Sequence, residues 1–184
     1  NLQSALALAV SGDQIWVAAG TYYPDEVAGQ SNNNRNSTFN LKNGVNVYGG
    51  FAGTESVLSQ RNPSGNVTIL SGDIGTVGVN TDNAYNVVSA LNLNSVTVLD
   101  GVTIRNGYAD VGSDFGGGMY ISNSSTAFQI TGVIFTNNFA GNGGGLAAFV
   151  SSPVLTRVIF SANTARQYGG GIYNQDGSPV LVDV

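Results

Sequence analysis

The chain has 184 residues, with six Lys and Arg against eleven Asp and Glu, no Cys, no His and a formal net charge of −5. This balance argues against a nucleic-acid partner, whose phosphates basic side chains would have to bind. The missing residue types exclude Ser-His-Asp and Cys-His catalysis and any disulfide framework. Because no apolar run approaches the roughly 18 residues that cross a bilayer, no transmembrane segment is expected.

Residues 1–11 are predicted to form an amphipathic helix that ends at Gly12, a residue suited to a left-handed stop. Its apolar positions have the spacing of one helix face: Leu2, Ala5, Leu6, Ala9 and Val10. Residues 14–23 then alternate as a β-strand. If the following strands stack as repeats, the helix would cap the first coil, whose core is otherwise open to water.

Two polar segments interrupt the strand pattern of residues 12–99. Residues 24–37 include three consecutive asparagines, and residues 75–84 are rich in Gly, Asn and Thr. Both are predicted to be loops that project from a scaffold, where binding residues are often found. Residues 12–99 are therefore expected to form irregular coils, and the alternative is that the loops are insertions without a function.

A glycine triplet recurs at a nearly constant interval in the second half of the chain. Gly143 follows Gly116 by 27 residues, and Gly169 follows Gly143 by 26. A fixed interval of this length indicates one supersecondary unit stacked on copies of itself. We expect the central glycines of the triplets to lie over one another at a tight corner: Gly117, Gly144 and Gly170.

Two other residue types repeat in step with the glycines. Phe160 follows Phe135 by 25 residues, and Asn163 follows Asn138 by the same interval. Identical amides on successive coils can form a hydrogen-bonded ladder, and identical rings can stack. Both pairs are therefore predicted to have a structural role.

Short β-branched runs, broken by Gly, Asn, Ser and Pro, lie between these positions without any helical apolar spacing. They predict an all-β coil of about three strands per turn, with successive coils about 4.8 Å apart as in a parallel sheet. We expect one domain over residues 1–184 with about seven coils, including regular coils of about 26 residues over 100–184. Because Ser178–Val184 repeats only the start of a coil, the last coil is expected to be incomplete.

Two motifs resemble those of known families. The opening from Leu2 to Tyr22, with its Gly12-Asp13 and Gly20-Thr21 pairs, resembles the pectate-lyase-like superfamily. The spacing of Phe135-x-x-Asn138 and the Gly143 triplet resembles the repeats of polymorphic outer-membrane proteins, which are autotransporter-type surface adhesins. A third glycine stands here where that family usually has Ala. The resemblance implies a right-handed parallel β-helix that is displayed at a cell surface.

Carboxylates are the groups on which an enzymatic activity would depend. Asp73 and Asp100 follow predicted strands and are 27 residues apart, so they could stack as the acid and base of a glycoside hydrolase. The alternative is that each binds the backbone of its own corner. Polysaccharide lyases of the superfamily that the opening resembles need Ca²⁺ and a basic residue. Asp110 and Asp114, with Arg105 before them, are the candidates, although Ca²⁺ takes six to eight oxygens. No other cofactor is expected.

Tyr120 and Tyr173 occupy equivalent positions after their glycine triplets, with Ala147 at that position between them. If they face outward, they could form an aromatic stripe on which sugar rings stack. If they face inward, they belong to the core.

The function expected from the sequence is non-enzymatic. We expect a secreted or cell-surface β-solenoid that acts as an adhesin, stalk or structural assembly subunit, with a carbohydrate or a host cell surface as its partner. One alternative is a homo-oligomeric extracellular filament joined through the open C-terminal coil. The other alternative is a carbohydrate-active enzyme, either a polysaccharide lyase or a glycoside hydrolase.

Overall fold

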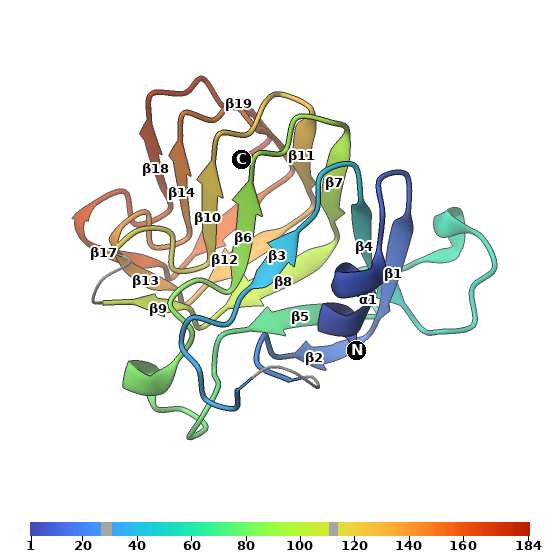
Figure 1. Ribbon diagram of the computed structural model, residues 1–184, viewed down its shortest axis with the longest axis horizontal. Coiled ribbons are helices and arrows are strands. Elements are labelled where there is room, and N and C mark those ends of the chain that lie inside the picture. The colour runs from blue at the N-terminus through green and yellow to red at the C-terminus, as the bar shows by residue number, and fades with distance from the viewer. Residues whose placement is uncertain (27–30, 111–113) are drawn as a thin grey trace.

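Short strands, each followed by a sharp corner, wind the chain into a right-handed parallel β-helix with one N-terminal α-helix (Figure 1). The computed structural model describes residues 1–26, 31–110 and 114–184. No helix in this part of the chain is long and apolar enough to cross a membrane.

The strands follow one another around the coils in a constant order. The helix and the first two coils comprise α1 (Leu2–Leu8), β1 (Gln14–Ala18), β2 (Gly20–Tyr22), β3 (Phe39–Leu41), β4 (Asn46–Phe51), β5 (Thr68–Ser71) and β6 (Val88–Leu91). The third and fourth coils comprise β7 (Thr97–Asp100), β8 (Val102–Arg105), β9 (Tyr108–Ala109), β10 (Met119–Ser122), β11 (Phe128–Thr131), β12 (Ile134–Thr136), β13 (Phe139–Asn142) and β14 (Leu146–Phe149). The last strands are β15 (Val154–Thr156), β16 (Ile159–Ser161), β17 (Thr164–Tyr168), β18 (Ile172–Gln175) and β19 (Val180–Val182).

Equivalent strands of successive coils pair in parallel to form four sheets. Sheet A has the order β1-β4-β7-β11-β15-β19, and sheet B has the order β16-β12-β8-β5-β2. Sheet C has the order β18-β14-β10-β6-β3, and the shorter sheet D has the order β17-β13-β9. Sheet D lies at the corner between sheets B and C, and its strands among the described residues begin in the third coil (Figure 1).

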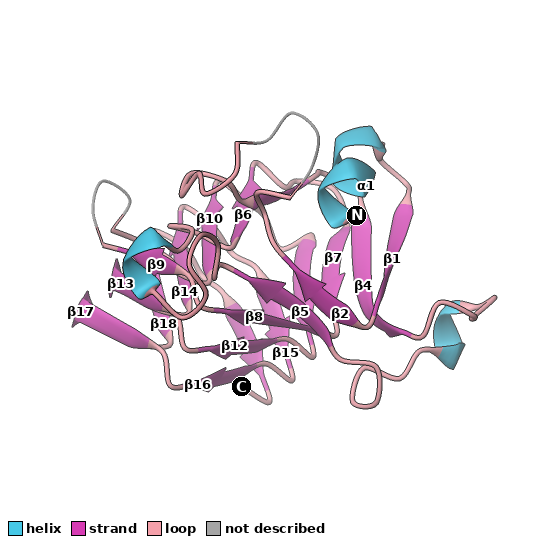
Figure 2. Ribbon diagram, turned by 90° about the horizontal axis from the view of Figure 1, so that it is seen from below, coloured by secondary structure: helices cyan, strands magenta, loops and turns pink. Residues whose placement is uncertain are grey.

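The described residues form five complete coils, and β19 begins a sixth, so the expectation of about seven was too high. The reason is the length of the early coils. Val47 pairs with Leu99, so the second coil takes 52 residues, whereas Ile130 pairs with Leu155 only 25 residues later. The second coil is long because two loops interrupt it, one between β4 and β5 and one between β5 and β6, and each contains a short 3-10 helix (Figure 2).

The corners depend on residues that tolerate positive φ. Asn106, Asn137 and Ala162 follow equivalent strands of sheet B and have φ values of 60°, 55° and 53°. Asparagine is the side-chain-bearing residue that most readily adopts this left-handed conformation. The Asn-rich composition therefore ends each strand at the same place and lets the chain turn into sheet D.

The second glycine of the first two triplets is required by a close approach of the backbone. A Cβ at Gly117 would lie 2.2 Å from the carbonyl oxygen of Phe139, and one at Gly144 would lie 2.4 Å from that of Thr164. Gly144 and Gly170 also approach each other, since the Cβ of an alanine at 144 would lie 2.8 Å from the carbonyl oxygen of Gly170. The recurrence of the triplets thus reflects adjacent coils that touch through their main chains.

The helix α1 closes the first coil. Leu2 and Leu6 are buried and belong to the main hydrophobic core. The helix ends at Leu8, earlier than expected, because Ala9 is already extended while its N–H donates to the carbonyl of Ala5. Gly12, with φ of 100°, serves instead in the turn that leads to β1.

The core runs along the inside of the coils as columns of matching side chains. Phe135 lies opposite Phe160 in register, and their rings stack with centroids 4.9 Å apart and planes inclined by 7°. This is the geometry that their 25-residue spacing predicts. The largest fully buried side chains include Phe39, Leu70, Leu99, Ile104, Met119, Ile121, Phe128, Ile130, Phe135 and Leu146.

Candidate functional site

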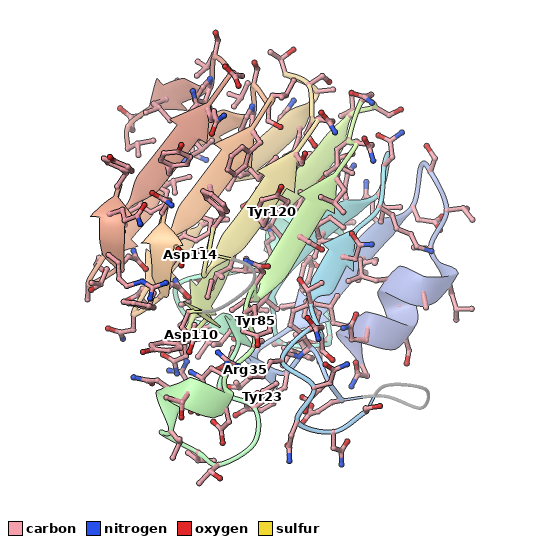
Figure 3. All side chains as sticks on the ribbon, turned by 60° about the vertical axis from the view of Figure 1, so that its left-hand side comes forward. Tyr23, Arg35, Tyr85, Asp110, Asp114 and Tyr120 are labelled. Carbon is pink, nitrogen blue, oxygen red and sulfur yellow. The ribbon has the colours of Figure 1, made fainter. Side chains whose placement is uncertain are left out.

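The outer face of sheet C carries the candidate site. Strand alternation directs Met119 and Ile121 into the core, so Tyr120 between them faces outward (Figure 3). Tyr120 is in register with Ala147, and Ala147 is in register with Tyr173. The two tyrosines therefore stand in one outward column, two coils apart, which settles the choice between an outward and an inward orientation.

Three more aromatic rings complete a cluster around this column. Phe149, two residues after Ala147, lies between the tyrosines, with its ring centroid 5.7 Å from that of Tyr120 and 5.8 Å from that of Tyr173. The ring of Phe115 contacts that of Phe149 edge-on at 4.8 Å. Tyr168, which is 65% exposed, lies 6.4 Å from Tyr173. We call these five residues the aromatic cluster.

The cluster forms a partly exposed apolar surface over the sheet. Ala147 is fully buried although it stands in the outward column, so the surrounding rings close over it. The centroid separations match those of favourable aromatic pairs. Because the rings pack against one another, the surface is already ordered before a ligand binds. Binding therefore costs little side-chain conformational entropy.

No outward position on the strands of sheet C carries a charged side chain, although Gln175 at the border donates to the carboxylate of Asp176 just beyond β18. The outward positions of the sheet's strands, all within the described residues, are occupied by Asn40, Ser89, Leu91, Tyr120, Ser122, Ala147, Phe149, Tyr173 and Gln175. Gln175 accepts a hydrogen bond from the hydroxyl of Tyr173 at 3.0 Å. The face therefore offers aromatic rings bordered by amides and hydroxyls, a combination that suits neutral, hydroxyl-rich molecules.

Sequence reasoning identified Tyr120 and Tyr173 but missed Phe115, Phe149 and Tyr168. Phe149 could have been found, because it lies two residues beyond Ala147 and must share its face of the strand. Phe115 and Tyr168 lie outside sheet C, in the segment before β10 and at the end of β17. Nothing in the repeat pattern places them beside the tyrosines.

The candidate Ca²⁺ ligands are engaged by arginines. Asp110 pairs with Arg35 at 2.7 Å, and Asp114 pairs with Arg166 at 2.6 Å. Arg166 also donates to the main-chain oxygen of Asp110. Among the described residues, no group of three or more Asp or Glu side chains could hold a metal ion. The arrangement favours a structural role for Asp110 and Asp114 over a role in metal binding.

Arg105, the candidate base of a lyase, is not paired with the candidate Ca²⁺ ligands. Arg105 ends β8 in sheet B, in register with Ser71 and Thr136. No ion pair joins it to Asp110 or Asp114 in the part of the chain that the structure describes.

Asp73 and Asp100 do not form a catalytic pair. Asp100 ends β7 in sheet A, where it is in register with Tyr48 and pairs with Arg61 at 2.6 Å. Asp73 follows β5 in sheet B and accepts a hydrogen bond from the N–H of Gly78. The 27-residue interval matched the repeat by chance, because the loops lengthen the second coil.

Burial of Tyr48 raises its pKa, the neighbouring Asp100 carboxylate raises this pKa further, and the Arg61 guanidinium partly opposes both effects.

The Asn138 and Asn163 side chains lie inside the coils and serve the fold. Asn138 is 1% exposed, and its amide bonds to three partners, one of which is Asn163.

Comparisons with protein-family models, with curated proteins and with solved structures found no match. The functional reading therefore depends on the geometry of the site.

Proposed function

We propose that this chain is a non-enzymatic, adhesin-type β-solenoid, secreted or displayed at a cell surface, that binds a neutral polysaccharide through the aromatic cluster. One observation carries the proposal. Five partly exposed rings lie together on a sheet face whose outward strand positions have no charged side chain. Sugar rings present C–H surfaces that stack on aromatic faces, and their hydroxyls pair with amides such as that of Gln175. The resemblance of the repeats to those of surface adhesins supports the proposed location.

The enzymatic alternative has less support. Asp100, Asp110 and Asp114 are each held by an arginine, and Asp73 binds its own loop. A glycosidase needs two carboxylates across one sugar linkage, one of which takes up and releases a proton. The aromatic cluster has no carboxylate among its members, so binding without hydrolysis is the activity that its chemistry favours.

An array of neutral and uronic-acid polysaccharides tests the proposal. We expect the labelled protein to bind at least one neutral polymer and to bind it more weakly after Tyr120→Ala or Tyr173→Ala. The matched control is Trp16→Ala, which removes an exposed ring stacked on Phe51 at the outer face of sheet A. Binding to acidic polymers alone, or equal binding by all variants, would show that the aromatic cluster is not the site.

A further inference from the structure

A hollow lies beside sheet D, outside the aromatic cluster. It has a volume of about 260 Å³ and opens between the loop that follows β5 and the first residues of β9, β13 and β17. Tyr108 and Phe139, whose rings stack at 4.6 Å, contribute to one wall, and the asparagines of the loop contribute to another. None of the described residues that line it is charged.

Asn83, which lines the hollow, has a side-chain oxygen that the fold leaves unused. Asn83 is 2% exposed, and while its Nδ2 donates to the carbonyl of Asn106 at 2.7 Å, its buried Oδ1 accepts no hydrogen bond from any described residue. A buried acceptor without a partner is rare and costs free energy, so it requires an explanation. Because this oxygen is closed to solvent, a ligand hydroxyl could donate to it only after the Asn83 side chain turns toward the hollow.

Further unused groups surround the opening. Asn80, Asn137 and Thr164 also line the hollow, and no hydrogen bond joins the side chain of any of them to another described residue. Asn138, by contrast, uses its whole amide within the coils. The hollow therefore combines an aromatic wall, a buried acceptor and several free amide and hydroxyl groups.

We infer that this hollow binds a single neutral, hydroxyl-rich ring of monosaccharide size. The aromatic wall would take the C–H face of the ring, and Asn80 and Thr164 would hydrogen-bond to its hydroxyls, while Asn83 would accept from one only after its side chain turns toward the hollow. An anionic ligand fits poorly, because the lining supplies no cation, and the nearby guanidinium of Arg166 is already held by Asp114 at 2.6 Å. The site is separate from the aromatic cluster, so either can fail without the other.

Chemical-shift mapping with methyl glycosides of neutral hexoses tests the inference, with glucuronate as the charged comparison. We expect at least one neutral glycoside to shift the amide signals of Tyr108 and Phe139, and glucuronate to do so more weakly. The variants Asn80→Ala and Thr164→Val should each weaken binding by roughly tenfold, the factor expected for one lost hydrogen bond. Both residues are exposed, so these variants are expected to fold.

The control separates the two sites. Tyr120→Ala, in the aromatic cluster, should leave the glycoside-induced shifts of the Tyr108 and Phe139 signals, and the affinity calculated from them, unchanged. The inference is overturned if no neutral glycoside shifts these signals, if glucuronate binds as well, or if Asn80→Ala and Thr164→Val leave the affinity unchanged. Loss of glycoside binding in Tyr120→Ala alone would also overturn it, because it would place the sugar on the aromatic cluster.

Discussion

The side-chain amide of Asn138 donates a hydrogen bond of 2.9 Å to the side-chain oxygen of Asn163, one coil further along. The same amide donates to the carbonyl of Ile104 and accepts from the N–H of Gly107, both in the preceding coil. One buried side chain thus joins three coils at the corner where sheet B turns into sheet D.

Replacement of Asn138 by Ala should lower the free energy of unfolding by about 3 kcal/mol, because a buried N–H and a buried carbonyl lose their partners. Chemical denaturation measures this change. Gln129→Ala, at an exposed outward position of β11 in the same coil, is the matched control and should change stability by less than about 0.5 kcal/mol. Equal effects of the two variants would contradict the role assigned to the ladder.

The variant Asn138→Asp should make stability depend on pH. The new carboxylate would be buried beside the carbonyl of Ile104, so its folded-state pKa would lie above its unfolded value of about 3.9. A raised folded-state pKa gives stability that is fully present below the unfolded value and is lost as pH rises through the folded one. Denaturation midpoints from acidic to neutral pH should therefore fall in the variant relative to the wild type, and parallel profiles would refute this expectation.

Gly144→Ala should destabilise the fold severely, by more than about 3 kcal/mol, because the main chain of the neighbouring coil would have to move away. Gly53→Ala provides the contrast. A Cβ at Gly53 meets nothing within 4 Å, and only its φ of 94° opposes the substitution, so a cost of about 1 kcal/mol is expected. Thermal unfolding of both variants checks the difference, and a larger loss in Gly53→Ala would rule out the close-approach explanation.

Neither added Ca²⁺ nor its removal with EDTA should shift the thermal midpoint. Asp110 and Asp114 are paired with arginines at 2.7 and 2.6 Å, so a cation would have to displace a guanidinium to bind them. Asp110→Asn, in contrast, should cost about 1–2 kcal/mol, because it weakens a charge-assisted hydrogen bond that is largely shielded from solvent. A Ca²⁺-dependent rise in the midpoint that disappears in Asp110→Asn would restore the metal-site interpretation.

Alkaline conditions should destabilise the protein through Tyr48. Burial and the Asp100 carboxylate raise its pKa above the ordinary 10.0, so the folded state holds the phenolic proton more tightly than the unfolded chain does. The associated stability is fully present below pH 10 and is lost as pH rises through the folded-state value. Tyr48→Phe removes the ionisable group and should flatten this part of the curve. An unchanged alkaline slope in the variant would assign the loss to other groups.

Much of the architecture could be predicted because identical residues in neighbouring coils have to meet. The intervals between Phe135 and Phe160 and between Gly117 and Gly144 are direct consequences of parallel in-register strands. The number of coils could not be predicted, because it depends on the lengths of the loops. The repeat does not fix those lengths. The 3-10 turn at residues 58–60 lies in a loop that the sequence pattern did not indicate.

The site was predicted only in part, for a related reason. Tyr120 and Tyr173 share a column, so their alignment followed from the repeat. Phe115 reaches Phe149 from a segment outside the regular strands, and contacts of this kind depend on tertiary placement. Asp73 and Asp100 show the converse error, in which a repeat-like interval in an irregular coil does not bring two residues together.

The central claim is that the aromatic cluster binds a neutral polysaccharide by stacking. Isothermal titration of the polymer selected on the array, into the wild type and into the Tyr120→Ala/Tyr173→Ala double variant, tests it most directly. Since burying one aromatic side chain contributes about 1.5–3 kcal/mol, the double variant should bind at least about tenfold more weakly. Tyr120→Phe/Tyr173→Phe keeps the rings and should retain most of the affinity. Wild-type affinity in a correctly folded Ala double variant would contradict the claim.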